Sequence, residues 1–168
     1  TLWHTLSLHD ALPIYARLNA AFREIEAGAP FLALAANRVF RDTDGKLSLD
    51  AGAFVKALEF ASGRPALVLG KPAPAFFHAA VRRLGCAPGQ VTPGQVTPGQ
   101  VTPGQVTMVG DDAESDVAGA LRAGLGAAIL VRTGKYRDGD EARVDPAPSA
   151  VVPSLREAVE AILAGGAA

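Results

Sequence analysis

The fold of this chain is decided by residues 105–120, which read Gln-Val-Thr-Met-Val-Gly-Asp-Asp-Ala-Glu-Ser-Asp-Val-Ala-Gly-Ala. The apolar run at residues 106–109 is typical of a buried strand in a parallel sheet. Gly110 ends that run, and Asp111, Asp112 and Asp116 follow it. Apolar residues then recur at helical spacing. The stretch therefore predicts a strand, an acidic loop and a helix.

Carboxylates in such a loop lie where open α/β sheets bind ligands, beyond the carboxyl ends of the strands. Clustered acids repel one another, and a hard cation such as Mg²⁺ relieves that repulsion. The loop therefore predicts a metal site that includes Asp111 and Asp112. The alternative is an ordinary helix start, whose acidic residues complement the helix dipole.

A second apolar run ends in the same way. Residues 66–72 read Ala-Leu-Val-Leu-Gly-Lys-Pro. If both strands are parallel neighbours in one sheet, Lys71 lies at the same edge as Asp111. A cation beside a metal-binding carboxylate suits an anionic substrate such as a phosphate ester.

With both stretches in view, the chain resembles the haloacid dehalogenase-like hydrolase superfamily. Gly70-Lys71-Pro72 resembles its third motif, and Gly110-Asp111-Asp112 through Asp116 resembles its fourth. Further stretches are similar to a capped subfamily that includes the phospholysine phosphohistidine inorganic pyrophosphate phosphatases. These stretches begin at Arg41, Phe54, Gly70 and Val131. The resemblance covers about residues 15–163 and corresponds to the carboxyl-terminal half of such a protein.

The resemblance implies a Mg²⁺-dependent phosphatase acting on phosphate monoesters, phosphoramidates or pyrophosphate. An aspartate of the first motif would form an aspartyl-phosphate, and water would hydrolyse it. By this resemblance Asp111 is a Mg²⁺ ligand, and Lys71 steadies the nucleophile and the phosphoryl oxygens. Asp112 and Asp116 support the metal or orient Lys71. The first and second motifs are absent from this sequence, so we expect a fragment without a nucleophile that is inactive as it stands.

One stretch imitates the missing first motif. Asp42-Thr43-Asp44-Gly45 matches the pattern Asp-x-Asp-Gly, in which the first aspartate would be the nucleophile. However, Arg38 and Arg41 interrupt the approach, where a nucleophile would follow a buried strand. Asp-Gly between two short extended runs is also a strong turn signal. We therefore expect a turn here, with a nucleophilic Asp42 as the alternative.

The chain divides by pattern into three parts. Residues 1–14 resemble a translated sequencing adapter and are predicted to be a non-native leader. Residues 15–63 are predicted to end a cap domain, and residues 64–164 to form the hydrolase core. The fold class is therefore α/β: the back half of a Rossmann-like, three-layer parallel-sheet core with the remnant of an α/β cap.

The core contains a tandem repeat. Pro-Gly-Gln-Val-Thr occurs four times, beginning at Pro88, Pro93, Pro98 and Pro103. A unit of five residues is far shorter than solenoid repeats of about 20 residues or more. We therefore expect an inserted surface loop at about residues 88–102, arising by slippage or misassembly. The alternative is a functional β-rich insert.

Other candidate residues have weaker support. His78 has no acidic or histidine partner nearby in the sequence and is predicted to be a packing or surface residue. Cys86 likewise has no partner that would make it a nucleophile. Lys135 follows a buried strand at residues 127–131, so it lies on the active-site side of the sheet. We expect a solvated loop lysine there, with contact to an anion as the alternative.

Composition excludes several classes of protein. The formal net charge is −1 over 168 residues, which gives no electrostatic case for binding nucleic acid or an anionic membrane. No apolar run approaches the roughly 20 residues that span a bilayer. A single cysteine fits a reducing cytoplasm. The expected partners are a small phosphorylated substrate in the intact protein and, as a further option, a second copy of the chain.

Two other functions remain open from the sequence. One is a non-catalytic α/β module that binds metal or phosphate. The other is a response-regulator receiver, whose acidic residues also bind Mg²⁺. Receivers carry their acidic pair near the amino terminus, before most strands, and this sequence has the opposite order.

Overall fold

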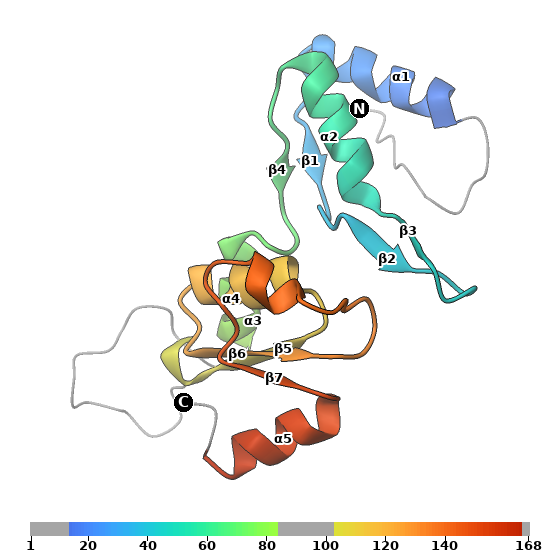
Figure 1. Ribbon diagram of the computed structural model, residues 1–168. Helices are drawn as coiled ribbons and strands as arrows, with labels where there is room; N and C mark the ends of the chain where they lie inside the picture. The colour runs from blue at the N-terminus through green and yellow to red at the C-terminus, as the bar shows by residue number, and fades with distance from the viewer. Residues whose placement is uncertain (1–13, 84–102, 166–168) are drawn as a thin grey trace. The chain divides into compact units, whose positions relative to one another are not determined.

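Residues 14–83 and 103–165 are described by the computed structural model of this protein, which divides into two units between Leu69 and Gly70 (Figure 1). The described residues of the first unit form two helices and four short strands. They are α1 (Ile14–Glu26), β1 (Leu32–Ala33), β2 (Val39–Arg41), β3 (Leu47–Leu49), α2 (Ala51–Ser62) and β4 (Leu67–Val68). β1 and β4 pair in parallel, whereas β2 and β3 form an antiparallel hairpin.

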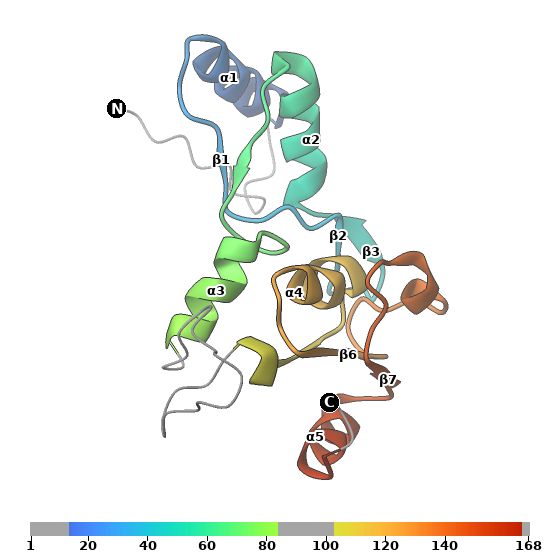
Figure 2. The same cartoon turned by 90° about the vertical axis from the view of Figure 1, so that its left-hand side faces the viewer.

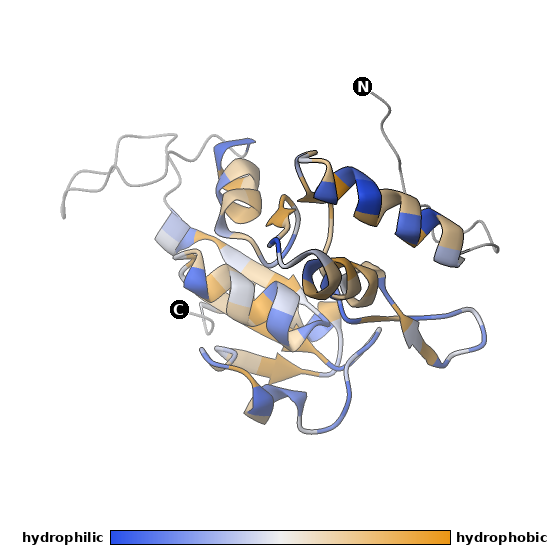
Figure 3. Ribbon diagram, turned by 90° about the horizontal axis from the view of Figure 1, so that it is seen from above, coloured by the Kyte–Doolittle hydropathy of each residue, from blue (hydrophilic) through white to orange (hydrophobic). Residues whose placement is uncertain are grey.

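The ends of α2 follow from local sequence. The Asp50 carboxylate accepts a hydrogen bond of 2.6 Å from the Ala51 N–H and caps the first turn. Gly63 ends the helix with φ 65°, and its N–H donates to the Glu59 carbonyl at 2.9 Å. α1 and α2 pack against each other, and Ile25 of α1 and Leu58 of α2 are buried. Figure 3 shows hydrophilic and hydrophobic residues interleaved along α1, beside the N label, as expected for a half-buried helix.

The Asp-Thr-Asp-Gly stretch is a turn, so this prediction is confirmed. It connects β2 to β3, with Gly45 at φ 78° and the Gly45 N–H donating to the Asp42 carbonyl at 2.9 Å. The Asp42 carboxylate accepts bonds from the Thr43 N–H at 2.7 Å and from Ser48 Oγ at 3.0 Å. These bonds hold Asp42 within the hairpin, where its carboxylate stabilises the turn.

The two-stranded β1–β4 sheet is apolar on both faces. Ala33 of β1 is buried, but four leucines on the other face of the sheet are exposed: Leu32, Leu34, Leu67 and Leu69. The apolar run at residues 31–36 is typical of a buried strand, but only one of its faces is buried here. Side chains alternate across a strand, and within the described residues only one face of β1 and β4 is covered.

The second unit is built on a three-stranded parallel sheet. Its elements are α3 (Pro74–Arg83), η1 (Pro103–Gln105), β5 (Thr107–Gly110), η2 (Ala113–Ala118), α4 (Gly119–Arg122), β6 (Ala127–Val131), η3 (Asp140–Arg143), β7 (Ala150–Val152) and α5 (Leu155–Leu163). The strand order is β5-β6-β7, with Val109 opposite Ile129 and Leu130 opposite Val151. β6 is buried along its whole length, and β7 is an edge strand.

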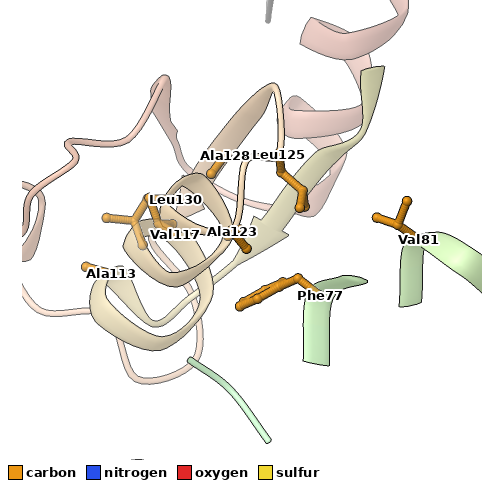
Figure 4. Close-up of a cluster of buried hydrophobic side chains, with 9 residues drawn as sticks. Phe77, Val81, Ala113, Val117, Ala123, Leu125, Ala128 and Leu130 are labelled. Atoms are coloured by element: carbon orange, nitrogen blue, oxygen red, sulfur yellow. The ribbon is translucent and has the colours of Figure 1, made fainter. Parts of the chain in front are cut away.

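Helices cover both faces of this sheet (Figures 1 and 2). On one face, Ala128 and Leu130 of β6 pack with Val117, Ala120 and Phe77 from η2, α4 and α3 (Figure 4). On the other face, Ile129 and Val131 pack with Ala158 of α5. The second unit is therefore a three-layer α/β structure, and the predicted parallel α/β fold class is correct.

The strand before Lys71 lies elsewhere than expected. β4 pairs with β1 in the first unit and is not a neighbour of β5. Its pattern, a short apolar run before glycine, suits any parallel strand and does not specify which sheet the strand joins. The break between the units follows Leu69, a few residues after the predicted boundary at residue 64. The identification of the first unit as a cap remains a prediction, and residues 1–14 lie outside the described residues except for the backbone of Ile14.

The fourth copy of the repeat is part of the folded second unit. Its first three residues form η1, and Thr107 begins β5. The Pro103 carbonyl accepts bonds from the Val106 N–H at 3.0 Å and from the Gly126 N–H at 3.1 Å. A side chain at Gly126 would have its Cβ 2.6 Å from the Gly104 carbonyl carbon. The predicted insert at residues 88–102 lies outside the described residues.

Deleting residues 88–102 is expected to leave the second unit folded. The deletion keeps one Pro-Gly-Gln-Val-Thr unit before β5, so the contacts to Gly126 are retained. Loop-closure entropy changes slowly with length, and we expect the free energy of unfolding to change by about 1 kcal/mol or less. Urea denaturation of both chains measures the difference. A loss of several kcal/mol would mean that the deleted copies pack on the core.

Within the described residues, none of the helices has the length and apolar character needed to cross a membrane.

Candidate active site at the carboxyl end of β5

The acidic loop begins where β5 ends, and its first residue must be small. A side chain at Gly110 would have its Cβ 2.5 Å from Cβ and Cγ of Asp116. Glycine at this position therefore lets the Asp116 carboxylate approach the backbone at the end of the strand. The Asp112 N–H donates to Asp116 Oδ2 at 3.2 Å, which closes the loop.

Asp112 starts the helix that follows. Its Oδ1 accepts bonds from the Glu114 N–H at 3.0 Å and from the Ser115 N–H at 2.8 Å. These bonds satisfy two N–H groups that a helix start leaves without partners. The alternative interpretation, in which the acids serve a helix N-terminus, is therefore correct for Asp112. It does not account for Asp111 or Asp116, which have other partners.

Lys71 and Asp116 form an ion pair, although they are far apart in sequence. Lys71 Nζ lies 2.5 Å from Asp116 Oδ1, and the Asp116 side chain is only 4% exposed. The segment that carries Lys71 packs closely on the start of α4, since a Cβ at Gly119 would lie 2.8 Å from Pro72 Cβ. The structure therefore brings Lys71 to the acidic loop, as the sequence predicted, but by this packing instead of by strand pairing with β5.

A second lysine enters the site from the loop after β6. The Lys135 N–H donates to Asp111 Oδ2 at 2.7 Å, and Lys135 Nζ lies 2.7 Å from Asp112 Oδ2. The side chain of Lys135 is 16% exposed. The expectation of a solvated loop lysine is therefore wrong. The signal that could have found it was its position: Lys135 follows a parallel strand that is the direct neighbour of β5.

The Asp112 carboxyl is ionised at neutral pH. Burial opposes its ionisation, but bonds from Lys135 and from the Ser115 N–H outweigh burial and lower the pKa of Asp112 from its ordinary value. The Asp112–Lys135 contact is therefore an attraction between full charges. Asp111 and Asp112 thus differ in their surroundings: Asp112 caps η2 and pairs with a lysine side chain, whereas Asp111 is held by a backbone N–H.

Comparison with known proteins now identifies the family. The sequence model described as HAD-hydrolase-like matches residues 68–158, which is more than half of the chain. The chain belongs to this family. The matched residues include the two lysines and three aspartates described above: Lys71, Asp111, Asp112, Asp116 and Lys135. The receiver alternative is thereby overturned.

The HAD-like relatives include phosphatases. The chain is 42% identical over 149 residues to haloacid dehalogenase-like hydrolase domain-containing protein 2 of Bos taurus, covering 89% of this chain and 51% of the relative. It is 39% identical over 152 residues to phospholysine phosphohistidine inorganic pyrophosphate phosphatase of Xenopus laevis, covering 89% and 50%. The chain thus spans about half the length of the curated relatives it matches.

A solved HAD-like phosphatase shares the fold. Glycerol phosphate phosphatase of Mycobacterium tuberculosis, crystallised in complex with magnesium, superposes with a TM-score of 0.63 at 29% identity. The match covers 90% of this chain and 40% of that protein. The parallel α/β architecture is therefore that of HAD-type phosphatases.

The fit of the acidic loop to Mg²⁺ depends on one carboxylate, that of Asp111. Within residues 14–83 and 103–165, no three His, Cys, Asp or Glu side chains come together as a group that could hold a metal ion. Mg²⁺ commonly uses one or two carboxylates together with waters and substrate phosphate. Asp111 fits such a ligand, because its carboxylate lies at a strand end and is oriented by an N–H. Asp112 and Asp116 are paired with lysines. The residues present therefore fit Mg²⁺ as a partial site centred on Asp111.

Two of the other candidate residues lie in the described part of the chain. His78 Nε2 lies 2.8 Å from the Ala123 carbonyl, a contact that ties α3 to the end of α4 and agrees with the expected packing role. Asp42 lies in the β2–β3 hairpin of the first unit. Cys86 falls outside the described residues.

Proposed function

We propose that this chain carries the lysine- and metal-binding part of a Mg²⁺-dependent phosphatase that acts on small phosphate monoesters, phosphoramidates or pyrophosphate. The observation that supports it is the ion pair of Lys71 with Asp116, which is bonded to the same loop that carries Asp111 at the end of β5. A cation held beside a metal-ligand carboxylate is suited to a phosphoryl group, whose charge needs stabilisation during transfer. The similarity to HAD-like phosphatases gives the same reaction class.

Each residue has a distinct proposed role. Asp111 is the Mg²⁺ ligand, and Mg²⁺ when bound neutralises charge on the phosphoryl oxygens. Lys71 donates hydrogen bonds to a phosphoryl oxygen and to the attacking carboxylate. Asp116 holds Lys71 in place from a buried position. Asp112 supports the loop that bears Asp111 by capping η2 and binding Lys135.

The proposed reaction passes through an aspartyl-phosphate. A carboxylate oxygen attacks phosphorus, the bond to the leaving group breaks, and water then hydrolyses the acyl phosphate. This sequence contains no first motif apart from the imitation at residues 42–45, which is a hairpin turn. We therefore propose that the nucleophile comes from the portion of the relatives' length that this chain does not span, and that the chain alone does not turn over substrate.

Hydrolysis of p-nitrophenyl phosphate tests the proposal. With saturating Mg²⁺, the chain alone should release no more p-nitrophenol than a no-enzyme control. A protein extended over the full length of the relatives should be active, and Asp111→Asn should lower its kcat at least about 100-fold, the scale of losing one stabilising group for transition-state charge. Asp138→Asn is the matched control: Asp138 is exposed on the loop that follows Lys135 and should change little.

Three results would contradict the proposal in different ways. Turnover by the chain alone that Lys71→Ala and Asp42→Asn each abolish would make Asp42 the nucleophile. Full activity of the extended Asp111→Asn protein would remove Asp111 from the site. An extended protein that binds inorganic phosphate with Mg²⁺ but never hydrolyses an ester would favour the alternative, a non-catalytic binding module.

A further inference from the structure

The Asp111 carboxylate is oriented by the loop after β6. Its Oδ2 accepts a 2.7 Å bond from the Lys135 N–H, and it lies against Gly134 so closely that a Cβ there would be 2.6 Å from Asp111 Cγ. Gly134 also has φ 57°, a conformation that side chains other than glycine rarely adopt. Residues 134 and 135 therefore form a backbone seat for Asp111.

The side chain of Lys135 fastens this seat to the acidic loop. Its Nζ binds Asp112 Oδ2 at 2.7 Å, and both side chains are 16% exposed. Asp112 cannot easily move away, because its Oδ1 is bound by the Glu114 and Ser115 N–H groups and its own N–H is bound to Asp116. Lys135 thus contacts both acids, one through its backbone and one through its side chain.

We propose that Lys135 is a positioning residue: its ion pair with Asp112 anchors the Gly134–Lys135 backbone, and that backbone holds the Asp111 carboxylate in its binding orientation. The link between the Lys135–Asp112 ion pair and the orientation of Asp111 is inferred from these contacts alone. Its consequence for metal binding rests on the proposed function, in which Asp111 is the Mg²⁺ ligand.

The proposal predicts an effect opposite in sign to simple electrostatics. Lys135 is a positive charge close to a cation ligand, so by Coulomb's law its removal would strengthen Mg²⁺ binding. If Lys135 orients Asp111, its removal instead weakens Mg²⁺ binding. Loss of a residue that orients a metal ligand typically costs about 10- to 100-fold in metal affinity.

Amide hydrogen exchange on the full chain without metal tests the coupling. In Lys135→Met the exchange rate of the residue 135 amide should rise about tenfold or more, the scale of losing a charge-assisted hydrogen bond. Lys46→Met is the control, because Lys46 is an exposed lysine of the β2–β3 hairpin, and it should leave this rate unchanged. Lys135→Arg keeps the charge and should restore most of the protection.

A Mg²⁺ titration of the same proteins, followed by the amide signals of residues 111 and 135, gives the second readout. Lys135→Met should raise the Kd about tenfold or more. Unchanged exchange in Lys135→Met, or tighter Mg²⁺ binding, would overturn the positioning role. If the unaltered chain shows no response to Mg²⁺, the metal part of the proposed function fails, while the exchange result still decides the role of Lys135.

Asp112→Asn provides an independent variant. The amide oxygen can still cap η2, but the charge that attracts Lys135 is lost. Exchange at residue 135 should again accelerate even if Lys135→Met proves too unstable to study. An amide at residue 135 that remains equally protected in Asp112→Asn would show that the ion pair does not hold the seat.

Discussion

Leu130→Ala is expected to lower the free energy of unfolding of the second unit by about 2–5 kcal/mol. Leu130 lies in the central strand β6, is 0% exposed, and packs in the cluster that joins the sheet to α3, η2 and α4. Removing most of its side chain loses apolar burial and leaves a cavity, because neighbours on a central strand have little room to close in.

Urea denaturation followed by the amide signals of β6 measures this loss. The midpoint should fall while the denaturant slope stays the same, as for a change in stability alone. Leu163→Ala is the matched control: Leu163 ends α5 and is 81% exposed, so its removal should cost about 0.5 kcal/mol or less. Equal costs for the two substitutions would mean that Leu130 is not in a packed core.

Gly126→Ala is expected to separate the last repeat copy from the sheet. The new Cβ would lie 2.6 Å from the Gly104 carbonyl carbon, and backbone atoms cannot rotate aside as a flexible side chain would. The turn at Pro103–Gln105 must shift, which weakens the bond from the Gly126 N–H to the Pro103 carbonyl. We expect a loss of about 1–3 kcal/mol, the usual scale for overpacking.

Gly124→Ala separates steric conflict from backbone strain. Gly124 lies with Gly126 in the connection between α4 and β6 and has φ 84°. A Cβ at Gly124 would meet nothing within 4 Å. Its replacement should cost about 1–2 kcal/mol through conformation alone. It should leave the Gly126 amide protected from exchange, whereas Gly126→Ala should expose the residue 126 amide. If both variants retain this protection, the contact between Gly104 and Gly126 does not constrain the sheet.

Features set by neighbouring residues could be predicted from the sequence. The Asp42–Gly45 turn depends on a few adjacent positions, and it was predicted from them. The cap at Asp50 and the helix end at Gly63 depend on local sequence in the same way. The buried strand β6 was found for the same reason, since an apolar run of five residues is a local signal.

Features set by tertiary placement could not be predicted in the same way. The apolar run at β4 carries no information about which strand it pairs with, and it pairs with β1. Lys135 binds Asp112 because β5 and β6 are neighbours, and the close approach of Gly104 to Gly126 depends on the same pairing. The meeting of Lys71 with Asp116 was expected at the right edge, but from a strand order that the structure does not have.

The contact between Gly126 and the repeat also bears on how alleles of this chain can differ in length. All four units have the same five residues, so whichever unit precedes Met108 presents the same proline carbonyl and the same glycine to Gly126. A change of whole units, fifteen nucleotides each, keeps the reading frame and this contact. A point substitution in the final unit, in contrast, can change the residues that contact Gly126. Selection should therefore tolerate variation in copy number while preserving the residues of the last copy.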